Sequence, residues 1–255
     1  MGKKIAITYE KGGVGKTTTA VNGAAILAEK GYKTLIVDLD FQSYATGYFG
    51  LVNNKRDSIF DVLAKETPAE QAIISTGFEK LDILPAVHAL KNVDTYLASL
   101  SFGQEYVLKN ALEPIEEKYD FILFDCPPAG LRIKTNALAA ADGLILPVIP
   151  DDFAIQGLLT ISEDVVAMKR GTNQNLKVYG VLVTIDENTN NKNAYRQALQ
   201  GQNIFYCFKQ TIRKNTTLSE AINSRKPIIH YDNSCNGAKD YRAFMDELLE
   251  VINNG

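Results

Sequence analysis

The chain has 255 residues, of which 45% are hydrophobic and 22% are charged, and its formal net charge is −3. This ordinary globular composition excludes intrinsically disordered, collagen-like and coiled-coil proteins, and the charge argues against a protein that coats nucleic acid with its whole surface. The apolar runs are far shorter than the ~20 residues of a membrane-spanning helix. Because no signal sequence precedes the first strand-like segment, we expect one soluble, cytoplasmic domain covering residues 1–255.

Strand-like and helical patterns alternate along the chain. Apolar runs without polar alternation are typical of strands buried on both faces, and they occur at residues 5–9, 34–37, 81–84, 121–124, 144–149 and 178–183. Helical patterns occur at residues 17–30, 57–65, 68–75, 104–118, 134–141 and 155–170. Capping boxes are expected at residues 67–70, with Thr67 as the N-cap and Pro68 as the first helical residue, and at residues 217–220.

This alternation predicts an α/β fold, in which a doubly wound, mostly parallel sheet carries helices on both faces. Ligands bind such sheets at the carboxyl ends of the strands. The chemistry-bearing residues are therefore sought where the apolar runs end.

A glycine-rich loop directly follows the first strand and precedes an alanine-rich helix; its residues are Lys11, Gly12, Gly13, Val14, Gly15, Lys16, Thr17 and Thr18. This order places backbone N–H groups and the positive end of a helix around a phosphate chain. We expect Lys16 to reach the β- and γ-phosphates of ATP, and the Thr17 hydroxyl to bind Mg²⁺. Glu10 occupies the first glycine position of the usual G-x-x-x-x-G-K-[ST] pattern. Lys11 is an additional cation, which could stabilise the transferred phosphoryl group.

Three acids come at the ends of two apolar runs. Asp38 and Asp40 follow residues 34–37, and Asp125 follows residues 121–124. Parallel strands end at one edge of the sheet, so these carboxylates are expected beside the glycine-rich loop. We expect Asp125 to hold Mg²⁺ through water and Asp40 to orient the attacking water. The alternative, a carboxylate that caps the following turn, describes Asp38 better than the other two acids.

These motifs resemble those of the ParA/MinD ATPases, whose deviant Walker A motif contains a signature lysine at the position of Lys11. The resemblance to ParA/Soj-type partition ATPases covers nearly the whole chain. It includes Val37-Asp38-Leu39-Asp40-Phe41-Gln42, where Phe41 replaces the usual proline, and also Leu218-Ser219-Glu220-Ala221 and Gly237-Ala238-Lys239-Asp240-Tyr241.

The resemblance implies a P-loop NTPase-like domain that hydrolyses ATP with Mg²⁺, with Lys11, Lys16, Asp40 and Asp125 as its catalytic residues. ATP would close a sandwich homodimer in which Lys11 crosses to the nucleotide of the other subunit. The resemblance also implies non-specific DNA binding at the nucleoid, and hydrolysis stimulated by a ParB-like, centromere-binding partner. The function expected is partition of a plasmid or a chromosome.

A basic segment near the C-terminus is the candidate DNA-binding surface. Residues 187–230 contain seven basic and two acidic side chains, a net charge of +5, although a solvated face without a partner explains this excess equally well. The family element I-P-R-N reads Ile212-Arg213-Lys214-Asn215 here, and the resemblance implies contacts of the Ile212 and Arg213 backbone with adenine. Arg196, Arg213 and Lys214 are candidates for phosphate contacts without sequence readout.

Other functions remain as alternatives. A ParA-like ATPase that positions another cargo fits the same motifs. A MinD-like division regulator would end in a basic amphipathic helix, whereas the polar face of the last helix here is acidic, so we expect no membrane partner and a helix that packs on the core. The iron protein of nitrogenase would need paired cysteine ligands, which Cys126 lacks. A module that binds ATP without hydrolysing it is disfavoured by Lys11 and Asp40.

Overall fold

The structure is a computed structural model that describes residues 2–53, 55–187 and 189–254. Met1 and Gly255, the two ends of the expected domain 1–255, lie outside the described residues.

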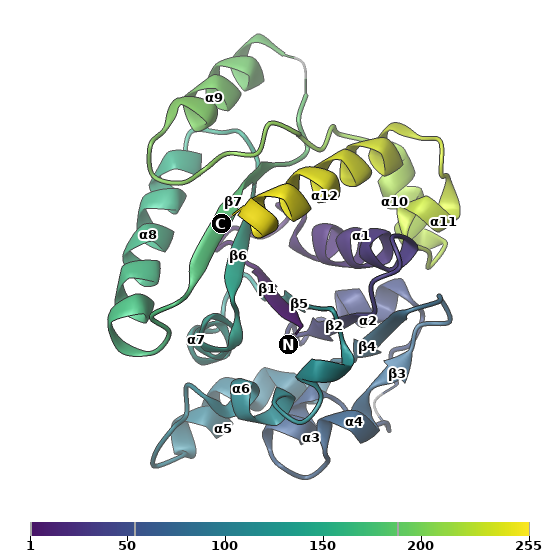
Figure 1. Cartoon of the computed structure of the whole chain (residues 1–255), viewed down its shortest axis with the longest axis vertical. Coiled ribbons are helices and arrows are strands. Elements are labelled where there is room, and N and C mark those ends of the chain that lie inside the picture. Colours follow the sequence, from purple (N-terminus) through teal and green to yellow (C-terminus); the bar gives the residue numbers. More distant parts are fainter. Residues whose placement is uncertain (1, 54, 188, 255) are drawn as a thin grey trace.

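The described chain forms a seven-stranded sheet in the order β3-β4-β2-β5-β1-β6-β7 (Figure 1). All neighbouring strands are parallel except β3 and β4. The prediction of a mostly parallel, doubly wound sheet is therefore confirmed. The strands are β1 Lys3–Ile7, β2 Thr34–Asp38, β3 Ile74–Ser75, β4 Leu81–Leu84, β5 Phe121–Asp125, β6 Gly143–Val148 and β7 Lys177–Val183.

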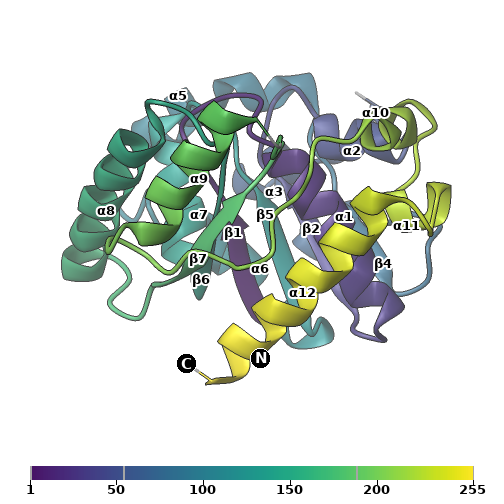
Figure 2. The same cartoon turned by 90° about the horizontal axis from the view of Figure 1, so that it is seen from above.

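Helices cover both faces of this sheet (Figure 2). The α-helices are α1 Lys16–Glu29, α2 Tyr44–Tyr48, α3 Ile59–Leu63, α4 Ala69–Ala72, α5 Val93–Ser99, α6 Val107–Leu112, α7 Leu131–Ala140, α8 Ala154–Gly171, α9 Asn190–Gly201, α10 Thr216–Asn223, α11 Ile228–Tyr231 and α12 Asn236–Asn254. Two short 3₁₀ helices, η1 His88–Asn92 and η2 Glu116–Lys118, lie beside α5 and β5 in the sequence.

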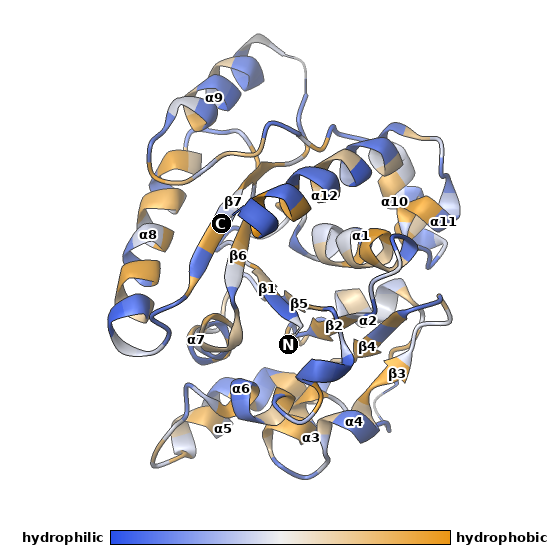
Figure 3. Cartoon of the chain, in the orientation of Figure 1, coloured by the Kyte–Doolittle hydropathy of each residue, from blue (hydrophilic) through white to orange (hydrophobic). Residues whose placement is uncertain are grey.

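Two hydrophobic cores lie on opposite sides of the sheet. One joins the sheet to α3 through α9, and the other joins it to α1, α2 and α10 through α12. Every residue of β2, β5 and β6 is buried, as expected for strands covered on both faces. Hydrophobic colouring accordingly follows the inner strands in Figure 3.

The C-terminal helix α12 packs on the hydrophobic core, as the sequence predicts, and its neighbour there is α1. Tyr241, Phe244, Met245 and Leu248 are buried in this interface. Leu249 and Ile252, which share the apolar stripe, are partly buried against the same core. Among the described residues, no helix is both long and apolar enough to cross a membrane.

The segment at residues 68–75 differs from the predicted helix. α4 ends at Ala72, because Ile73 takes an extended backbone, and Ile74–Ser75 then forms the antiparallel edge strand β3. The adjacent β-branched residues Ile73 and Ile74 favour such an extended chain. Pro68 is the extended N-cap rather than the first helical residue, so the predicted cap at Thr67 is also wrong.

Two further helix boundaries differ from the prediction. The helix expected at residues 104–118 is limited to α6, since Pro114 cannot supply the N–H group that would continue it. The capping box expected at residues 217–220 is absent: Asn215 is the N-cap of α10, and its Oδ1 accepts from the Thr217 N–H at 2.9 Å. A capping box occurs instead at the start of α3, between Ser58 and Asp61.

Candidate nucleotide site

The glycine-rich loop lies at the carboxyl end of β1, between β5 and β6. Gly13 and Gly15 have φ angles of 75° and 85°, and Gly15 is the N-cap of α1. This left-handed backbone is readily available only to glycine, which explains both positions. Nothing in the described structure lies within 4 Å of where a Cβ on Gly12 or Gly13 would be, so the space over the loop is open.

Lys16 is buried beneath the loop, with 7% of its surface exposed. Its Nζ donates to the carbonyl oxygen of Lys11 at 3.0 Å. Burial lowers the pKa of Lys16, while Asp125 and Asp40 oppose this shift. The ammonium group of Lys16 therefore lies near Asp125, at the end of β5, and Asp40, just beyond β2.

Thr184 anchors the loop from the opposite side of the site. Its Oγ1 donates to the carbonyl oxygen of Val14 at 2.8 Å and also lies 3.3 Å from that of Val148. A side chain just beyond β7 therefore joins the loop to the end of β6. No sequence motif marks Thr184, an ordinary strand-end threonine, so its contact with the loop could not be predicted.

Asp125 is fully buried at the end of β5, and neither of its side-chain oxygens forms a hydrogen bond of ordinary geometry with the described residues, although the Thr17 side chain lies near enough to act on it as a donor. Burial raises its pKa well above the ordinary value, and the nearby Asp38 carboxylate raises it further. Thr17 and Lys16 favour the charged form. A buried carboxylate with unsatisfied oxygens, beside a threonine hydroxyl, matches the hard oxygen donors that Mg²⁺ prefers.

The strand register explains why these acids meet. Asp38 of β2 lies opposite Asp125 of β5. Asp38 is engaged, since its Oδ2 accepts from the Thr46 N–H at 2.8 Å and from the Thr46 hydroxyl at 2.7 Å. Burial raises the pKa of Asp38 to about 6. The alternative of a capping carboxylate therefore describes Asp38 correctly.

Asp40 accepts fewer hydrogen bonds than Asp38 does. One of its oxygens, Oδ1, accepts from the Gln42 N–H at 2.9 Å, and 7% of the residue is exposed. Asp40 also acts electrostatically on both Lys16 and Asp125. The structure thus brings Asp40 together with the expected phosphate and magnesium residues.

Lys11 lies at the surface of the site, with 49% of its side chain exposed. Its Nζ donates to Oδ2 of Asp151 of the same chain at 2.5 Å. Asp151 is in the turn that precedes α8. The ammonium group is therefore held at the edge of the site by its own subunit.

The start of α8 also packs against Tyr9, two residues before the loop. The hydroxyl of Tyr9 donates to the carbonyl oxygen of Ala154 at 3.1 Å. A Cβ on Gly157 would lie only 2.2 Å from that hydroxyl oxygen. The glycine is needed here because the tyrosine passes directly over the helix.

The two residues expected at adenine have part of their backbone engaged already. The N–H of Ile212 donates to Val183 and its carbonyl accepts from Asp186, at 2.9 and 3.0 Å. The N–H of Arg213 donates to Oδ2 of Asp240 at 3.0 Å. These N–H groups are occupied, whereas the Ile212 carbonyl retains a second acceptor position.

Each of the three candidate DNA-binding residues forms an ion pair. Arg196 pairs with Asp186 at 2.7 Å, and Lys214 pairs with Glu187 at 2.8 Å. Arg213 makes a bidentate pair with Asp240, at 2.6 and 2.9 Å. Asp186 and Asp240 lie outside residues 187–230, so the net charge of +5 counted along the sequence overstates the local positive charge.

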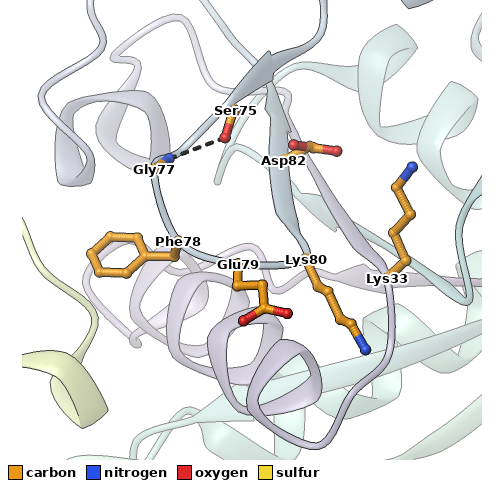
Figure 4. Close-up of a pocket in the computed structure, with 7 residues that line it drawn as sticks. All are labelled: Lys33, Ser75, Gly77, Phe78, Glu79, Lys80 and Asp82. Atoms are coloured by element: carbon orange, nitrogen blue, oxygen red, sulfur yellow. Dashed lines mark hydrogen bonds between the residues drawn. The ribbon is translucent and has the colours of Figure 1, made fainter.

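A cavity of about 540 Å³ lies at the opposite edge of the sheet (Figure 4). Its lining comes from the amino-terminal ends of β2 and β4 and from the turn between β3 and β4: Lys33, Ser75, Gly77, Phe78, Glu79, Lys80 and Asp82. None of the predicted site residues lines it. The chemistry of the nucleotide loop therefore has no connection with this cavity.

Comparison with known proteins decides the family. A model described as an AAA domain matches residues 2–178. The sporulation initiation inhibitor protein Soj of Bacillus subtilis is 37% identical over 257 residues, which cover 100% of both chains. The chromosome partitioning protein ParA of Myxococcus xanthus is 34% identical, over 98% of this chain and 89% of that protein. The chain belongs to the ParA/Soj family of ATPases.

Solved structures agree with this family assignment. The cobyrinic acid a,c-diamide synthase of Mycobacterium smegmatis, solved with bound ADP and magnesium, superposes with a TM-score of 0.88 at 28% identity, over 100% of this chain and 97% of that chain. The cell division ATPase MinD of Pyrococcus furiosus gives a TM-score of 0.77 at 25% identity, over 100% and 99% of the two chains. The P-loop NTPase-like fold that the resemblance implied is therefore confirmed.

Proposed function

We propose that residues 1–255 form a single domain that hydrolyses ATP with Mg²⁺ and drives partition of a plasmid or chromosome. The observation that carries this proposal is the partnerless, buried Asp125 beside Lys16 and Thr17 under an open glycine-rich loop. The M. smegmatis structures with bound ADP or an ATP analogue, each with magnesium, support the choice of nucleotide.

Residues 11–18 would bind the phosphates through their N–H groups and through Lys16, which would exchange the Lys11 carbonyl for phosphate oxygens. Thr17 and Asp125 would hold Mg²⁺, Asp125 through water. Bound Mg²⁺ offsets charge on the triphosphate and on the leaving group. Asp40 would orient the attacking water with the oxygen that does not cap Gln42.

Two subunits would close around two ATP molecules, and Lys11 would then leave Asp151 for the nucleotide of the other subunit. The half-exposed side chain of Lys11 gives it the freedom to do so. Phe153 and Leu131, at the starts of α8 and α7, have exposed fractions of 73% and 75%. Apolar side chains at the same edge as Lys11 are typical of a surface that becomes covered.

The dimer would bind DNA non-specifically through Arg196, Arg213 and Lys214, and would be nucleoid-associated in the cytoplasm. Because each of these cations is paired with an acid, DNA phosphates must compete with a carboxylate, and retention needs the combined surface of two subunits. A ParB-like, centromere-binding partner would stimulate hydrolysis, as the resemblance to ParA-type ATPases implies.

Positioning of another cargo, or regulation of division, is a second candidate. It is favoured by the cell division protein PomZ of Myxococcus xanthus, which is 33% identical over 94% of this chain and 75% of that protein.

Light scattering with ADP and with ATP, in the presence and absence of non-specific DNA, tests the proposal. We expect a 28.1 kDa species with ADP, a dimer with ATP, and DNA retention of the dimer alone. An ATP-saturated monomer would contradict the sandwich dimer, and a dimer that ignores DNA would contradict the nucleoid role.

A further inference from the structure

Glu10 places a negative charge directly before Lys11, next to a loop proposed to bind a polyanion. An uncompensated carboxylate there repels phosphate through Coulomb's law. In the structure, its Oε1 accepts from the Nζ of Lys134 at 3.3 Å. Lys134 belongs to α7, the helix that follows the strand and turn carrying Asp125.

The side chain of Lys134 is largely buried and is held by two ion pairs. Only 17% of its side chain is exposed, against 51% for Glu10. Its Nζ also donates to Oδ2 of Asp164 on α8, at 2.7 Å, which is the shorter of its two contacts. Burial lowers the pKa of Lys134, but the Asp164 and Glu10 carboxylates outweigh burial and raise it. The ammonium group therefore stays charged, and Asp164 fixes its place.

We propose that Lys134 is a positioning residue for nucleotide binding: anchored by Asp164, it holds Glu10 and offsets part of its charge, so that the loop can accept the triphosphate. This inference rests on the proposed binding of ATP, but it requires neither dimerisation nor DNA binding. It also explains how this chain accommodates an acid at position 10.

Two single variants distinguish an electrostatic role of the Glu10–Lys134 contact from a purely structural one. Lys134→Met leaves Glu10 uncompensated, and should weaken MgATP binding about fivefold. Glu10→Gln removes the repelling acid and leaves Lys134 paired with Asp164, and should tighten binding by a similar factor. The double variant should bind within about twofold of the wild type. If the contact only braces the loop, both single variants weaken binding, and the double variant is no better than either.

The measurement is displacement of a fluorescent ATP analogue by MgATP and by MgADP, with melting temperatures recorded for every variant. The effects should be smaller for ADP, which carries less charge, and Lys134→Arg should bind like the wild type. Lys169→Met, which removes an exposed lysine at the end of α8, is the matched control and should change nothing.

If Lys134→Met does not fold, Lys134→Gln tests the same claim, because it removes the ammonium charge but keeps an N–H donor for the two carboxylates. We then expect a loss of ATP affinity of similar size, which Glu10→Gln reverses. Weaker binding by Glu10→Gln, or unchanged binding by a folded variant in which Lys134 has lost its positive charge, would overturn the inference. A wild-type chain that binds no nucleotide would instead overturn the proposed function.

Discussion

The Nζ of Lys11 lies 2.5 Å from a carboxylate oxygen of Asp151 in the same chain. A lysine that acts on the nucleotide of another subunit must first leave this partner. Because Lys11 is half-exposed, the ion pair is screened by solvent and its loss is a small cost. The triphosphate of a second subunit offers a more highly charged competitor.

Lys11→Ala should therefore retain ATP binding but lose both dimerisation and hydrolysis. The phosphate loop and Lys16 remain intact in this variant, whereas the cation that would reach across the interface is gone. Nucleotide titration, light scattering and a phosphate-release assay measure the three properties. A Lys11→Ala dimer with normal turnover would remove the case for a lysine acting between subunits.

Lys16→Ala should abolish nucleotide binding. Lys16 is buried at the centre of the site, and no other described ammonium group faces Asp125 and Asp40 from within the loop. Loss of the charge-assisted contacts to two phosphates should reduce affinity by at least about 100-fold. Equilibrium titration with the fluorescent ATP analogue provides the test, and affinity close to that of the wild type would contradict the assignment.

Asp125→Asn should stop hydrolysis and stabilise the nucleotide-free protein. The carboxylate is fully buried without a hydrogen-bond partner, so its charge is a cost in the folded state. We expect the free energy of unfolding to rise by about 1–3 kcal/mol at pH 8.

The stability gained by Asp125→Asn should increase as the pH rises. The folded-state pKa of Asp125 is raised above the unfolded value, as is that of Asp38, which reaches about 6. Such groups stabilise the folded state at low pH and lose that contribution as the pH rises through the folded pKa. The advantage of Asp125→Asn should therefore be larger at pH 8 than at pH 5. Chemical unfolding without nucleotide or Mg²⁺ measures it, and a destabilised variant at pH 8 would contradict the unpaired charge.

Lys214→Ala should weaken retention on non-specific DNA while leaving ATP turnover near that of the wild type. The side chain is 63% exposed, and it pairs only with the surface residue Glu187 among the described residues. We expect the slope of log affinity against log salt to fall by about 0.9 for each lost phosphate contact. Lys169→Ala provides a matched exposed lysine outside the basic segment. Equal DNA affinity of Lys214→Ala at low salt would exclude this residue from the surface.

The loop and the acids could be predicted because local sequence determines them. A glycine-rich turn that leads from an apolar run into a helix through Gly-Lys-Thr is typical of a phosphate-binding loop, and an acid that ends an apolar run lies at the carboxyl edge of a parallel sheet. Asp125 and Asp40 were placed beside Lys16 on this reasoning, and the structure puts them there.

The partners of the loop could not be predicted, because tertiary packing selects them. Asp151 lies 140 residues from Lys11, and Thr184 lies 170 residues from Val14. Many exposed acids could have paired with Lys11, and nothing in the pattern distinguishes one of them. The acids that pair with the basic segment could not be predicted for the same reason: Asp240, the partner of Arg213, belongs to α12.

The structure of the ATP-loaded form measures the central claim most directly. The account predicts two subunits face to face, with the Nζ of each Lys11 within about 3 Å of a phosphate oxygen held by the other subunit. A single ATP-bound protomer, in which Lys11 still contacts Asp151 of its own chain, would contradict it.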